Sequence, residues 1–447
     1  MSEFVRIIDP SGKTLRNDLY NSPPDVASYI IFKDGGLIKA KNGRTGQIEF
    51  SSSDAAAVIQ YAVNKADGII FIRNGSYDIA SIITLRNDTI IVGEGRKTIL
   101  NNTSEGFMIY IDQYTSNVRI SNLKITSETS VNGIDCHGDN VIFDNLFLEK
   151  MAYAISMTAH VSCATVRDCL FTNGAGFSTA GSDVLISNNI FDESGIVTVS
   201  GGNNINFLSN VFINSFGRVD YQGAIHVDVV VTNINGVVIA HNLIRFTENP
   251  PHKQHGIVVS GEARNTRSTT NVIICNNIVD GGAFANSLKG IYLHGYSAEY
   301  LNVKNVLVEG NIVKRTTTGF GIANTDTAMF INNRLYDVTN PISMDDVSLN
   351  IVFKQNTGYI TENSGTAIFS GDGTTDDFSI GAHGLAVTDP NRIVVKVSPI
   401  SSDAIAASPC VGYVDPADNT KIRVKFARAP ASGTDNVKII WEAQAAS

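Results

Sequence analysis

One pattern of apolar and polar residues repeats ten times along the chain, from Val118-Arg119-Ile120 to Ile351-Val352-Phe353. Each copy has two apolar residues at alternate positions, then two polar or small residues, then a recurring sixth position. The residues at the sixth position are Leu123, Leu146, Cys169, Asn189, Asn210, Asn242, Asn277, Asn311, Asn333 and Asn356. The steps between them are 23, 23, 20, 21, 32, 35, 34, 22 and 23 residues, so three consecutive steps are much longer than the rest.

A repeat of this length, built from short alternating strands, predicts a solenoid, because one coil cannot bury its own apolar face and must stack on its neighbours. Val141–Phe143 and Leu146–Leu148 form two strands of one coil, joined by a turn at Asp144-Asn145. A third strand begins with Gly-Ile or a close variant, as in Gly256-Ile257 and Gly290-Ile291. Three strands per coil predict an all-β chain, a right-handed parallel β-helix of about 10 to 12 coils.

Seven asparagines in succession occupy the sixth position, from Asn189 to Asn356. An Asn amide both donates and accepts hydrogen bonds, so one at the same turn of each coil can bond to the backbone of the next coil. The regular spacing therefore predicts an asparagine ladder that holds the fold and takes no part in chemistry.

Both ends of the solenoid need a cap, because an open sheet edge invites aggregation. Asp54–Val63 has apolar residues at helical spacing and good N-cap residues before it, which predicts an N-terminal capping helix. Hairpin signals at Asp34-Gly35-Gly36 and Lys41-Asn42-Gly43 precede the helix, in what we expect to be an attachment segment. After Asn356 the pattern changes to strands and turns, which predicts a small C-terminal β-sandwich. The expected segments are residues 1–50, 51–362 and 363–447.

Composition excludes some functions. The net charge is −9, which argues against a nucleic-acid partner, and no apolar run is long enough to span a membrane. The first six residues lack the basic and apolar regions of a signal peptide. Cys136, Cys169 and Cys275 lie inside the repeat and are expected to be free thiols, and the cysteine spacings match no zinc pattern. We therefore predict no metal site.

Five short motifs stand between residues 54 and 100. They are Asp54-Ala55-Ala56-Ala57-Val58-Ile59-Gln60, Gly68-Ile69-Ile70-Phe71-Ile72, Asn74-Gly75-Ser76-Tyr77, Gly93-Glu94-Gly95 and Thr98-Ile99-Leu100. Together with the coils up to residue 362, these motifs resemble the pectate-lyase superfamily, especially its viral tailspike-like branch. Three C-terminal runs resemble the small β-domains that end some viral tail proteins. They are Phe378-Ser379-Ile380, His383-Gly384-Leu385 and Val394-Val395-Lys396-Val397.

The resemblance implies a polysaccharide partner that lies along the helix axis, in a groove over the Gly-Ile strands. It also implies an extracellular or virion-associated protein, and a homotrimer is one assembly open to such a spike. The superfamily includes lyases, hydrolases, epimerases and receptor binders, so the resemblance indicates a fold more than a reaction.

The long steps lie where the resemblance expects the groove. Between Asn210 and Asn311 the extra residues fall before and after the Gly-Ile strands, which predicts longer walls on both flanks of the same coils. If Ile225, Ile257 and Ile291 point inward, the alternate residues form the floor. This floor has His226, Val258 and Tyr292 in one column and Asp228, Ser260 and His294 in the next. The predicted walls are Asp220, Tyr221, Arg245, Glu248, His252, Lys253 and His255 on one side, and Glu262, Arg264, Arg267, Tyr296 and Glu299 on the other.

Two mechanisms are open for these residues. A lyase or epimerase removes the proton beside a uronate carboxylate, with His226 or His294 as base and Tyr292 as acid. Arg264 or Arg267 would then neutralise the carboxylate. A hydrolase instead needs a pair of carboxyl groups at a set distance. The candidates for that pair are Asp220, Asp228, Glu248 and Glu262.

Several alternatives remain at this point. The acidic balance slightly favours a neutral polymer, unless local Arg residues or Ca²⁺ offset the repulsion of a polyanion; no cofactor is otherwise required. The groove residues could also serve a non-catalytic adhesin, with Tyr292 and Tyr296 stacking on sugar rings. Asp135 and His137, on a coil without long loops, are expected to be structural. For an enzyme we expect His226 or Asp228 to lie within one coil of Tyr292 or His294.

Overall fold

The computed structural model describes residues 27–445, apart from residues 131, 218, 262–266, 297–300, 346, 359–361, 386 and 388 and the side chains of 128–130. Residues 1–26 of the predicted attachment segment therefore lie outside the described residues. The three segment boundaries predicted from the sequence stay predictions.

Three sheets run the length of the solenoid. The first sheet has the strand order β3 (Ile48–Ser52), β2 (Leu37–Asn42), β1 (Tyr29–Asp34), β4 (Ile69–Ile72), β7 (Ile90–Gly93), β10 (Ser116–Ser121), β13 (Asp139–Asp144), β16 (Ser162–Arg167), β19 (Ser182–Ser187), β22 (Gly202–Leu208), β25 (Ile234–Ala240), β28 (Thr269–Cys275), β31 (Val303–Glu309), β34 (Thr325–Ile331) and β37 (Leu349–Lys354). The second sheet has β5 (Gly75–Ile79), β8 (Thr98–Asn102), β11 (Lys124–Ser130), β14 (Phe147–Met151), β17 (Leu170–Thr172), β20 (Ile190–Asp192), β23 (Val211–Ile213), β26 (Leu243–Arg245), β29 (Ile278–Asp280), β32 (Ile312–Lys314) and β35 (Arg334–Tyr336). The third sheet has β6 (Ile83–Leu85), β9 (Ile109–Ile111), β12 (Ile134–Cys136), β15 (Ile155–Met157), β18 (Phe177–Thr179), β21 (Val197–Val199), β24 (Gly223–Asp228), β27 (Gln254–Ser260), β30 (Ser287–His294), β33 (Thr318–Ala323) and β36 (Asn340–Met344).

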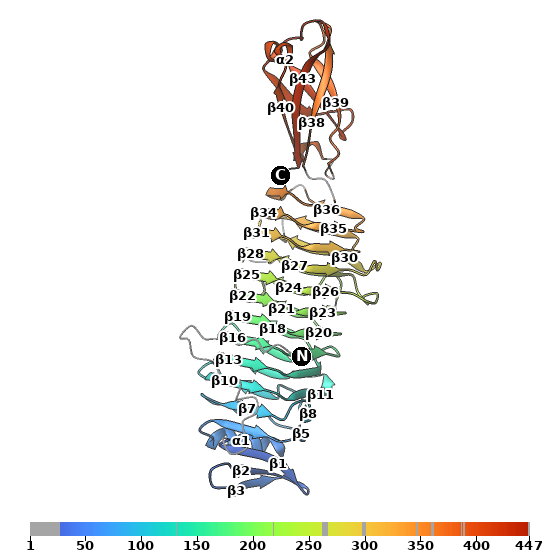
Figure 1. The fold of residues 1–447 in the computed structure, drawn as a ribbon. Coiled ribbons are helices and arrows are strands. Elements are labelled where there is room, and N and C mark those ends of the chain that lie inside the picture. Colours follow the sequence, from blue (N-terminus) through green and yellow to red (C-terminus); the bar gives the residue numbers. More distant parts are fainter. Residues whose placement is uncertain are drawn as a thin grey trace, which may run out of the picture.

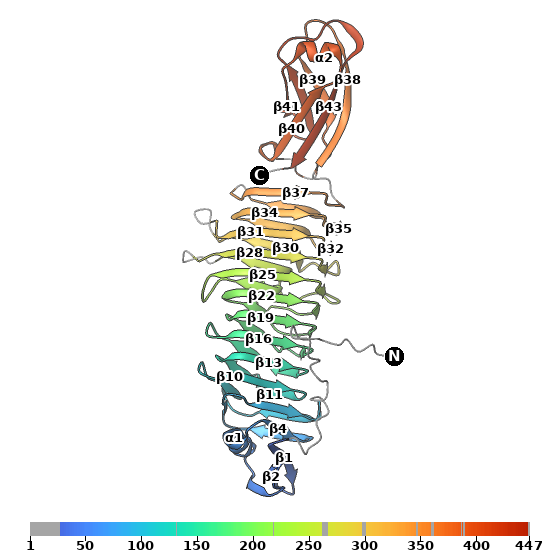
Figure 2. The same ribbon diagram turned by 60° about the vertical axis from the view of Figure 1, so that its left-hand side comes forward.

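From β4 to β37, consecutive strands along the chain belong to different sheets, and every third strand returns to the same sheet one coil further on (Figure 1). From β4 to β37 all pairings between coils are parallel. Each coil therefore contributes one strand to each sheet, and the stack forms a long rod (Figure 2). The prediction of a parallel β-helix with three strands per coil is confirmed.

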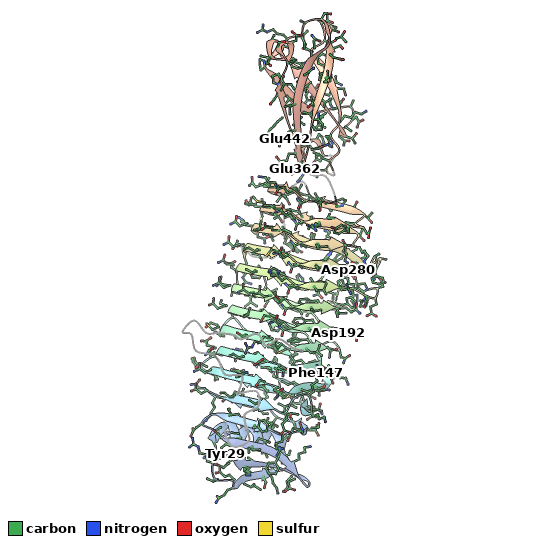
Figure 3. The ribbon with its side chains drawn as sticks, viewed as in Figure 1. Tyr29, Phe147, Asp192, Asp280, Glu362 and Glu442 are labelled. Atoms are coloured by element: carbon green, nitrogen blue, oxygen red, sulfur yellow. The ribbon has the colours of Figure 1, made fainter. Side chains whose placement is uncertain are left out.

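The interior is filled by residues that alternate inward along each strand. Phe171, Phe191 and Phe212 take the same position in three successive coils, and their ring centroids stack 4.6 Å apart. Alternate residues face solvent; Phe147 and Asp192 are examples on the second sheet, along one edge of the rod (Figure 3). Stacked like residues give each coil the same packing partner above and below, which is why the repeat specifies the fold.

The asparagine ladder forms as predicted. Asn277 is fully buried, donates from its amide to Ile239 O (2.8 Å) and Asn311 Oδ1 (2.9 Å), and accepts from Asn242 N (2.9 Å). The same pattern runs from Asn189 to Asn356, and Cys169 N bonds to Asn189 at its start. The ladder satisfies buried backbone groups at the turn between the first and second sheets.

At the N-terminal end, β1, β2 and β3 form antiparallel hairpins that extend the first sheet through β1 and β4. The helix α1 (Ala55–Lys65) follows, and its N-cap Asp54 accepts a hydrogen bond from Ala57 N (3.2 Å). Its apolar face is buried among strands of the first coils, so the predicted capping helix is present. No helix within the described ranges is long and apolar enough to cross a lipid bilayer.

Beyond β37 the chain forms a second, smaller unit (Figure 1). One antiparallel sheet has β38 (Glu362–Gly371), β43 (Gly433–Ala445) and β40 (Ile393–Pro399), and the other has β39 (Asp377–Ala382), β42 (Lys421–Phe426) and β41 (Cys410–Val414). A 3₁₀ turn (Pro390–Arg392) precedes β40, and α2 (Ser402–Ala407) follows it. Trp441 packs in the core between these sheets, as expected for a small β-sandwich.

Candidate functional site

The three long steps bring β24, β27 and β30 side by side in the third sheet. Ile225, Ile257 and Ile291 pair with one another and are fully buried, so they set the inward direction of these strands. The alternate residues form the two predicted columns, His226 with Val258 and Tyr292, and Asp228 with Ser260 and His294. Both columns therefore face the outside of the same sheet.

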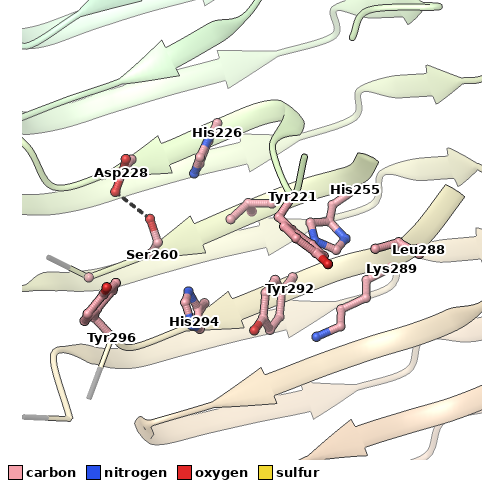
Figure 4. A pocket seen from close by; sticks show the side chains of 12 residues that line it. Tyr221, His226, Asp228, His255, Ser260, Leu288, Lys289, Tyr292, His294 and Tyr296 are labelled. Carbon is pink, nitrogen blue, oxygen red and sulfur yellow. Dashed lines mark hydrogen bonds between the residues drawn. The ribbon is translucent and has the colours of Figure 1, made fainter. Parts of the chain in front are cut away.

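A cavity of about 400 Å³ opens over these columns (Figure 4). Residues from β24, β27, β30 and their flanking loops line it. They are Tyr221, His226, Asp228, His255, Val258, Ser260, Gly261, Leu288, Lys289, Tyr292, His294 and Tyr296. Tyr221 and Tyr296 are more than half exposed, so they provide aromatic surface at the cavity for contact with a ligand.

Tyr292 lies at the centre of this cavity. Its ring stacks on His294, with the centroids 5.0 Å apart, and lies 5.1 Å from the ring of His255. Lys289 Nζ lies 3.4 Å from the centroid of the same ring, which is a close cation–π contact. One phenol is thus surrounded by two imidazoles and an ammonium group.

A β-bulge precedes Lys289 in β30. Gln254 pairs with Ser287 but the next residue, His255, pairs with Lys289, so Leu288 is an extra residue. Simple alternation along the strand would have assigned Lys289 to the inward side with Ile291, yet Lys289 and its partner His255 both line the cavity. In the next coil Gly321 pairs with Tyr292, and a Cβ there would lie 2.5 Å from Lys289 Cδ. Because Gly321 has no side chain, the space beside it is open for the side chain of Lys289.

Asp228 is the single carboxylate among the described residues that line the cavity. Ser260 Oγ donates to Asp228 Oδ1 (2.7 Å), which fixes the carboxylate between two coils (Figure 4). By contrast, His255 is fully buried, and neither of its ring nitrogens has a hydrogen-bonding partner among the described residues. Buried polar atoms without partners are costly, so a polar ligand at this position would relieve an unfavourable feature of the fold.

Burial keeps the histidines neutral. It lowers the pKa of His226, and together with Lys289 it lowers the pKa of His294. The pKa of His255 falls to about 3, mainly by burial and partly by the charge of Lys289. Burial also lowers the pKa of Lys289 to about 8 and, with Asp345, raises the pKa of Tyr292. At neutral pH the cavity therefore holds neutral imidazoles that can accept protons, a protonated phenol and a cationic lysine.

Comparison with known proteins gives no matching family model and no matching curated protein. Solved structures do match. The A-module of the mannuronan C-5 epimerase AlgE4 of Azotobacter vinelandii is 15% identical, with 68% of this chain and 91% of that chain covered and a TM-score of 0.50. The surface adhesin PfbA of Streptococcus pneumoniae is 15% identical over 67% and 87%, with a TM-score of 0.49. The tailspike protein gp49 of the Acinetobacter baumannii bacteriophage Fri1, a capsular polysaccharide depolymerase, is 10% identical over 88% and 82%, with a TM-score of 0.44.

The chain is a right-handed parallel β-helix protein. At such identities the likeness shows the fold alone, so the chemistry of this β-helix protein has to be argued from its own cavity.

The structure brings together the four predicted catalytic residues and three of the predicted substrate-binding residues. The three are Tyr221, His255 and Tyr296. The roles of all seven stay predictions. The expectation that His226 or Asp228 lies within one coil of Tyr292 or His294 is wrong, because β27 lies between β24 and β30. Among the four predicted catalytic residues, Tyr292 and His294 are in ring contact, and they come from one strand.

Other predicted wall residues do not line the cavity. Asp220 pairs with His252 (3.8 Å) and accepts from Lys253 N (2.9 Å), on the outside of the wall. Arg267 donates to Val230 O, and Glu248 is exposed away from the cavity. Arg245 pairs with Asp280 on the second sheet (3.7 Å). Glu262, Arg264 and Glu299 lie outside the described residues.

Sequence reasoning missed Lys289 and Leu288. No group of three or more His, Cys, Asp or Glu side chains among the described residues is arranged to hold a metal ion.

Proposed function

We propose that this β-helix protein acts on a polysaccharide that contains a uronic acid, by removing the proton at C5 of the uronate in the cavity of β24, β27 and β30. The observation that carries the proposal is that Lys289 and His294 both lie against the phenol ring of Tyr292, while the imidazole of His294 is kept neutral. Proton abstraction beside a carboxylate needs a base, an acid and a cation that stabilises the enolate, and this grouping supplies all three.

His294 takes the role of base and removes the C5 proton. Lys289 stabilises the negative charge that develops on the uronate carboxylate. In a lyase the C4–O4 bond then breaks, a C4=C5 double bond forms, and Tyr292 donates its proton to the departing O4. In an epimerase a water molecule instead returns a proton to C5 from the opposite face, because Tyr292 and His294 stand side by side on one strand and face the same side of the sugar. In both cases His294 ends protonated. The proton donor ends as the Tyr292 phenolate in the lyase and as hydroxide in the epimerase, and solvent restores these groups.

Hydrolysis has less support. Hydrolases of polysaccharides mostly use two carboxyl groups on either side of the scissile bond. Asp228 is the one carboxylate among the described lining residues, and Ser260 already holds it. Asp220 and Glu248, the other described candidates, lie outside the cavity.

The charged residues in the cavity also indicate whether the substrate is neutral or anionic. The whole chain carries −9, which at first favours a neutral polymer. The cavity, however, is lined by one carboxylate, which Ser260 holds, and by Lys289, whose pKa near 8 leaves it mostly protonated at neutral pH. A fixed cation in a sheltered cavity favours an anionic group more than the average field opposes it.

A panel of polysaccharides tests the proposal. It should include polymannuronate, polygalacturonate, an α-1,3-glucan and acidic bacterial capsules, with three readings for each. Absorbance of an unsaturated product, or deuterium at C5 after reaction in D₂O, is expected for at least one uronate polymer. Reducing ends without either signal would indicate hydrolysis. Binding without any reaction would leave the adhesin alternative.

We further propose that the protein works outside a cell or on a virus particle, as a homotrimer. The rod of stacked coils with a separate C-terminal sandwich suits a surface spike. Light scattering coupled to size exclusion would measure the number of chains, and a monomer at micromolar concentration would contradict the trimer. Ca²⁺ stays a proposal as an auxiliary ion, tested by adding a chelator to the same polysaccharide panel.

A further inference from the structure

The outer face of the third sheet continues well beyond the cavity. One residue per coil extends the column of His226 toward the N-terminal end, in unbroken parallel register. These residues are Thr198, Ser178, Ser156, Asp135 and Tyr110. All five are partly exposed. The cavity is thus one end of a longer surface that runs along the helix axis.

At the far end of this surface three rings form a row. The ring centroids of Tyr110 and His137 are 5.3 Å apart, and those of His137 and His160 are 6.3 Å apart and nearly parallel. The rings come from three successive coils, so their spacing follows the coil spacing. The ring contacts and hydrogen bonds of His137 within the described residues join it to Tyr110, His160, Asp135 and Thr158, none of which lines the cavity.

The central ring of the row is held in place. His137 Nε2 bonds to Asp135 Oδ2 (3.1 Å), and His137 Nδ1 bonds to Thr158 Oγ1 (3.2 Å). Because a carboxylate only accepts, Nε2 carries the proton and Nδ1 accepts from the hydroxyl. Both nitrogens are used, which leaves the ring faces and edges as the contact surface. A purely structural pair would not need two further rings in line with it at the surface.

Between the row and the cavity the outward residues of this column are small. Ser156, Ser178 and Thr198 carry small hydroxyl side chains, which leave space for a chain and offer donors and acceptors to sugar hydroxyls. From β9 to β24 there are five inter-strand steps, or roughly 24 Å, which is about five sugar units if each spans one step.

We infer that the row of Tyr110, His137 and His160 is a second saccharide-binding site, which holds a sugar unit of the same polysaccharide at a distance from the reacting unit. This inference rests on the proposed function. The carboxylates of Asp112 and Asp135 beside the row disfavour a second uronate there, so the bound unit is a neutral sugar of a mixed polymer. The rings stack on its apolar face, as aromatic residues do in carbohydrate sites.

The test is binding as a function of chain length. The probes are end-labelled oligosaccharides of two to twelve units, made by partial depolymerisation of each panel polysaccharide that the full chain binds, with Tyr292→Phe as the host to prevent turnover. We expect affinity to rise about tenfold once the oligosaccharide reaches both sites. Tyr110→Ala or His160→Ala should remove that rise and leave the affinity of short oligosaccharides unchanged. Tyr114→Ala is the matched control, since Tyr114 is 82% exposed on the neighbouring turn and lies outside the row.

Each outcome is decisive. The second site is overturned if the rise in affinity with chain length persists in both Tyr110→Ala and His160→Ala. It is also overturned if the protein with an intact row shows no such rise. In either case the proposed reaction stands. Loss of turnover of short oligosaccharides in His137→Gln would make the row the reacting centre and would also overturn its assignment as a remote site. If no panel polysaccharide binds to the chain at all, the proposed function and this inference fail together.

Discussion

The third sheet contains two neighbouring groups of strands that differ on their outer face. The first group is β15, β18 and β21, from regular coils, and the second is β24, β27 and β30, from the long coils. The inward residues of both groups are apolar and fully buried. They are Ile155, Phe177 and Val197 in the first group and Ile225, Ile257 and Ile291 in the second. Their outward residues change from serine and threonine to histidine, aspartate and tyrosine. Packing constrains the inner column in every coil, whereas the outer column is free to vary, so function can be added to one part of the rod without changing the fold.

The connections differ in the same way. The regular coils advance by 20 to 23 residues, and the three long ones by 32 to 35. Extra residues in surface loops cost little stability, because the entropy of loop closure grows slowly with length. In the long coils these residues place Tyr221, His255 and Tyr296 around the cavity. All coils therefore contribute to stability through the same buried columns, whereas the residues proposed for chemistry are confined to the three long coils.

The largest expected effect separates the two regions by activity. His294→Gln and Tyr292→Phe should each lower turnover of the responsive polysaccharide by about 10²- to 10⁴-fold, since they remove the base and the acid. Thr165→Ala, on the outer face of the first sheet in a regular coil, is the matched control and should leave turnover unchanged. Circular dichroism would verify that all three variants fold. An equal loss of turnover in the control variant would contradict the assignment of the reaction to the long coils.

The ladder should show the opposite behaviour, with equal effects in both regions. Asn277→Leu, in the long coils, leaves Asn242 N and Ile239 O without their partner, and Asn189→Leu does the same to Cys169 N and Val166 O in the regular coils. Each substitution should lower the free energy of unfolding by about 2 to 4 kcal/mol. Denaturant unfolding measures it. A large loss for one and none for the other would show that stability is not shared.

Acid sensitivity should be specific to the long coils. The pKa of His255 is about 3 in the fold and near its ordinary value when unfolded, so between these values the unfolded chain binds a proton that the folded chain does not. Stability therefore falls as pH drops below about 6.5. Replacing His255 by Asn should reduce the loss between pH 7 and pH 5 by about 2 kcal/mol. Melting at the two pH values tests this, and an identical loss in the variant would contradict the buried neutral state.

The smallest effect concerns Lys289. Its pKa near 8 predicts that activity falls above pH 8 as the charge is lost, and the lowered pKa of His294 predicts an acidic limb below about 6.5. Lys289→Met should lower kcat/KM about tenfold, and Lys289→Arg should shift the alkaline limb upward. The pH profile of kcat/KM is the measurement. An alkaline limb that stays in place in Lys289→Arg would assign that limb to another group.

Much of this arrangement could be predicted from the sequence. The repeat specifies the inward residues, and strand alternation then placed His226, Tyr292 and His294 on one face without any structural information. The unequal steps also indicated the coils over which the cavity opens. These features depend on local periodicity, which the sequence carries directly.

The rest depends on geometry that the repeat does not carry. Alternation assigns Lys289 to the inward side with Ile291, yet it lines the cavity, and nothing in the strand pattern marks this departure. The loop residues Asp220 and Arg267 were expected in the walls, but they bond to other loop atoms because loops do not follow the repeat. The prediction of a structural role for Asp135 and His137 rests on the absence of a long loop in their coil. Their ring contacts with Tyr110 and His160 depend on side-chain positions that the repeat does not carry.

The central claim is that proton abstraction takes place in the cavity of the long coils. Reaction of the responsive polysaccharide in D₂O, with the unaltered chain and with His294→Gln, tests it most directly by magnetic resonance of the product. The unaltered chain should give a C4=C5 double bond or deuterium at C5, and the variant should give neither at a comparable rate. New reducing ends with a saturated, undeuterated product, or the same C5 chemistry in the variant, would contradict the account.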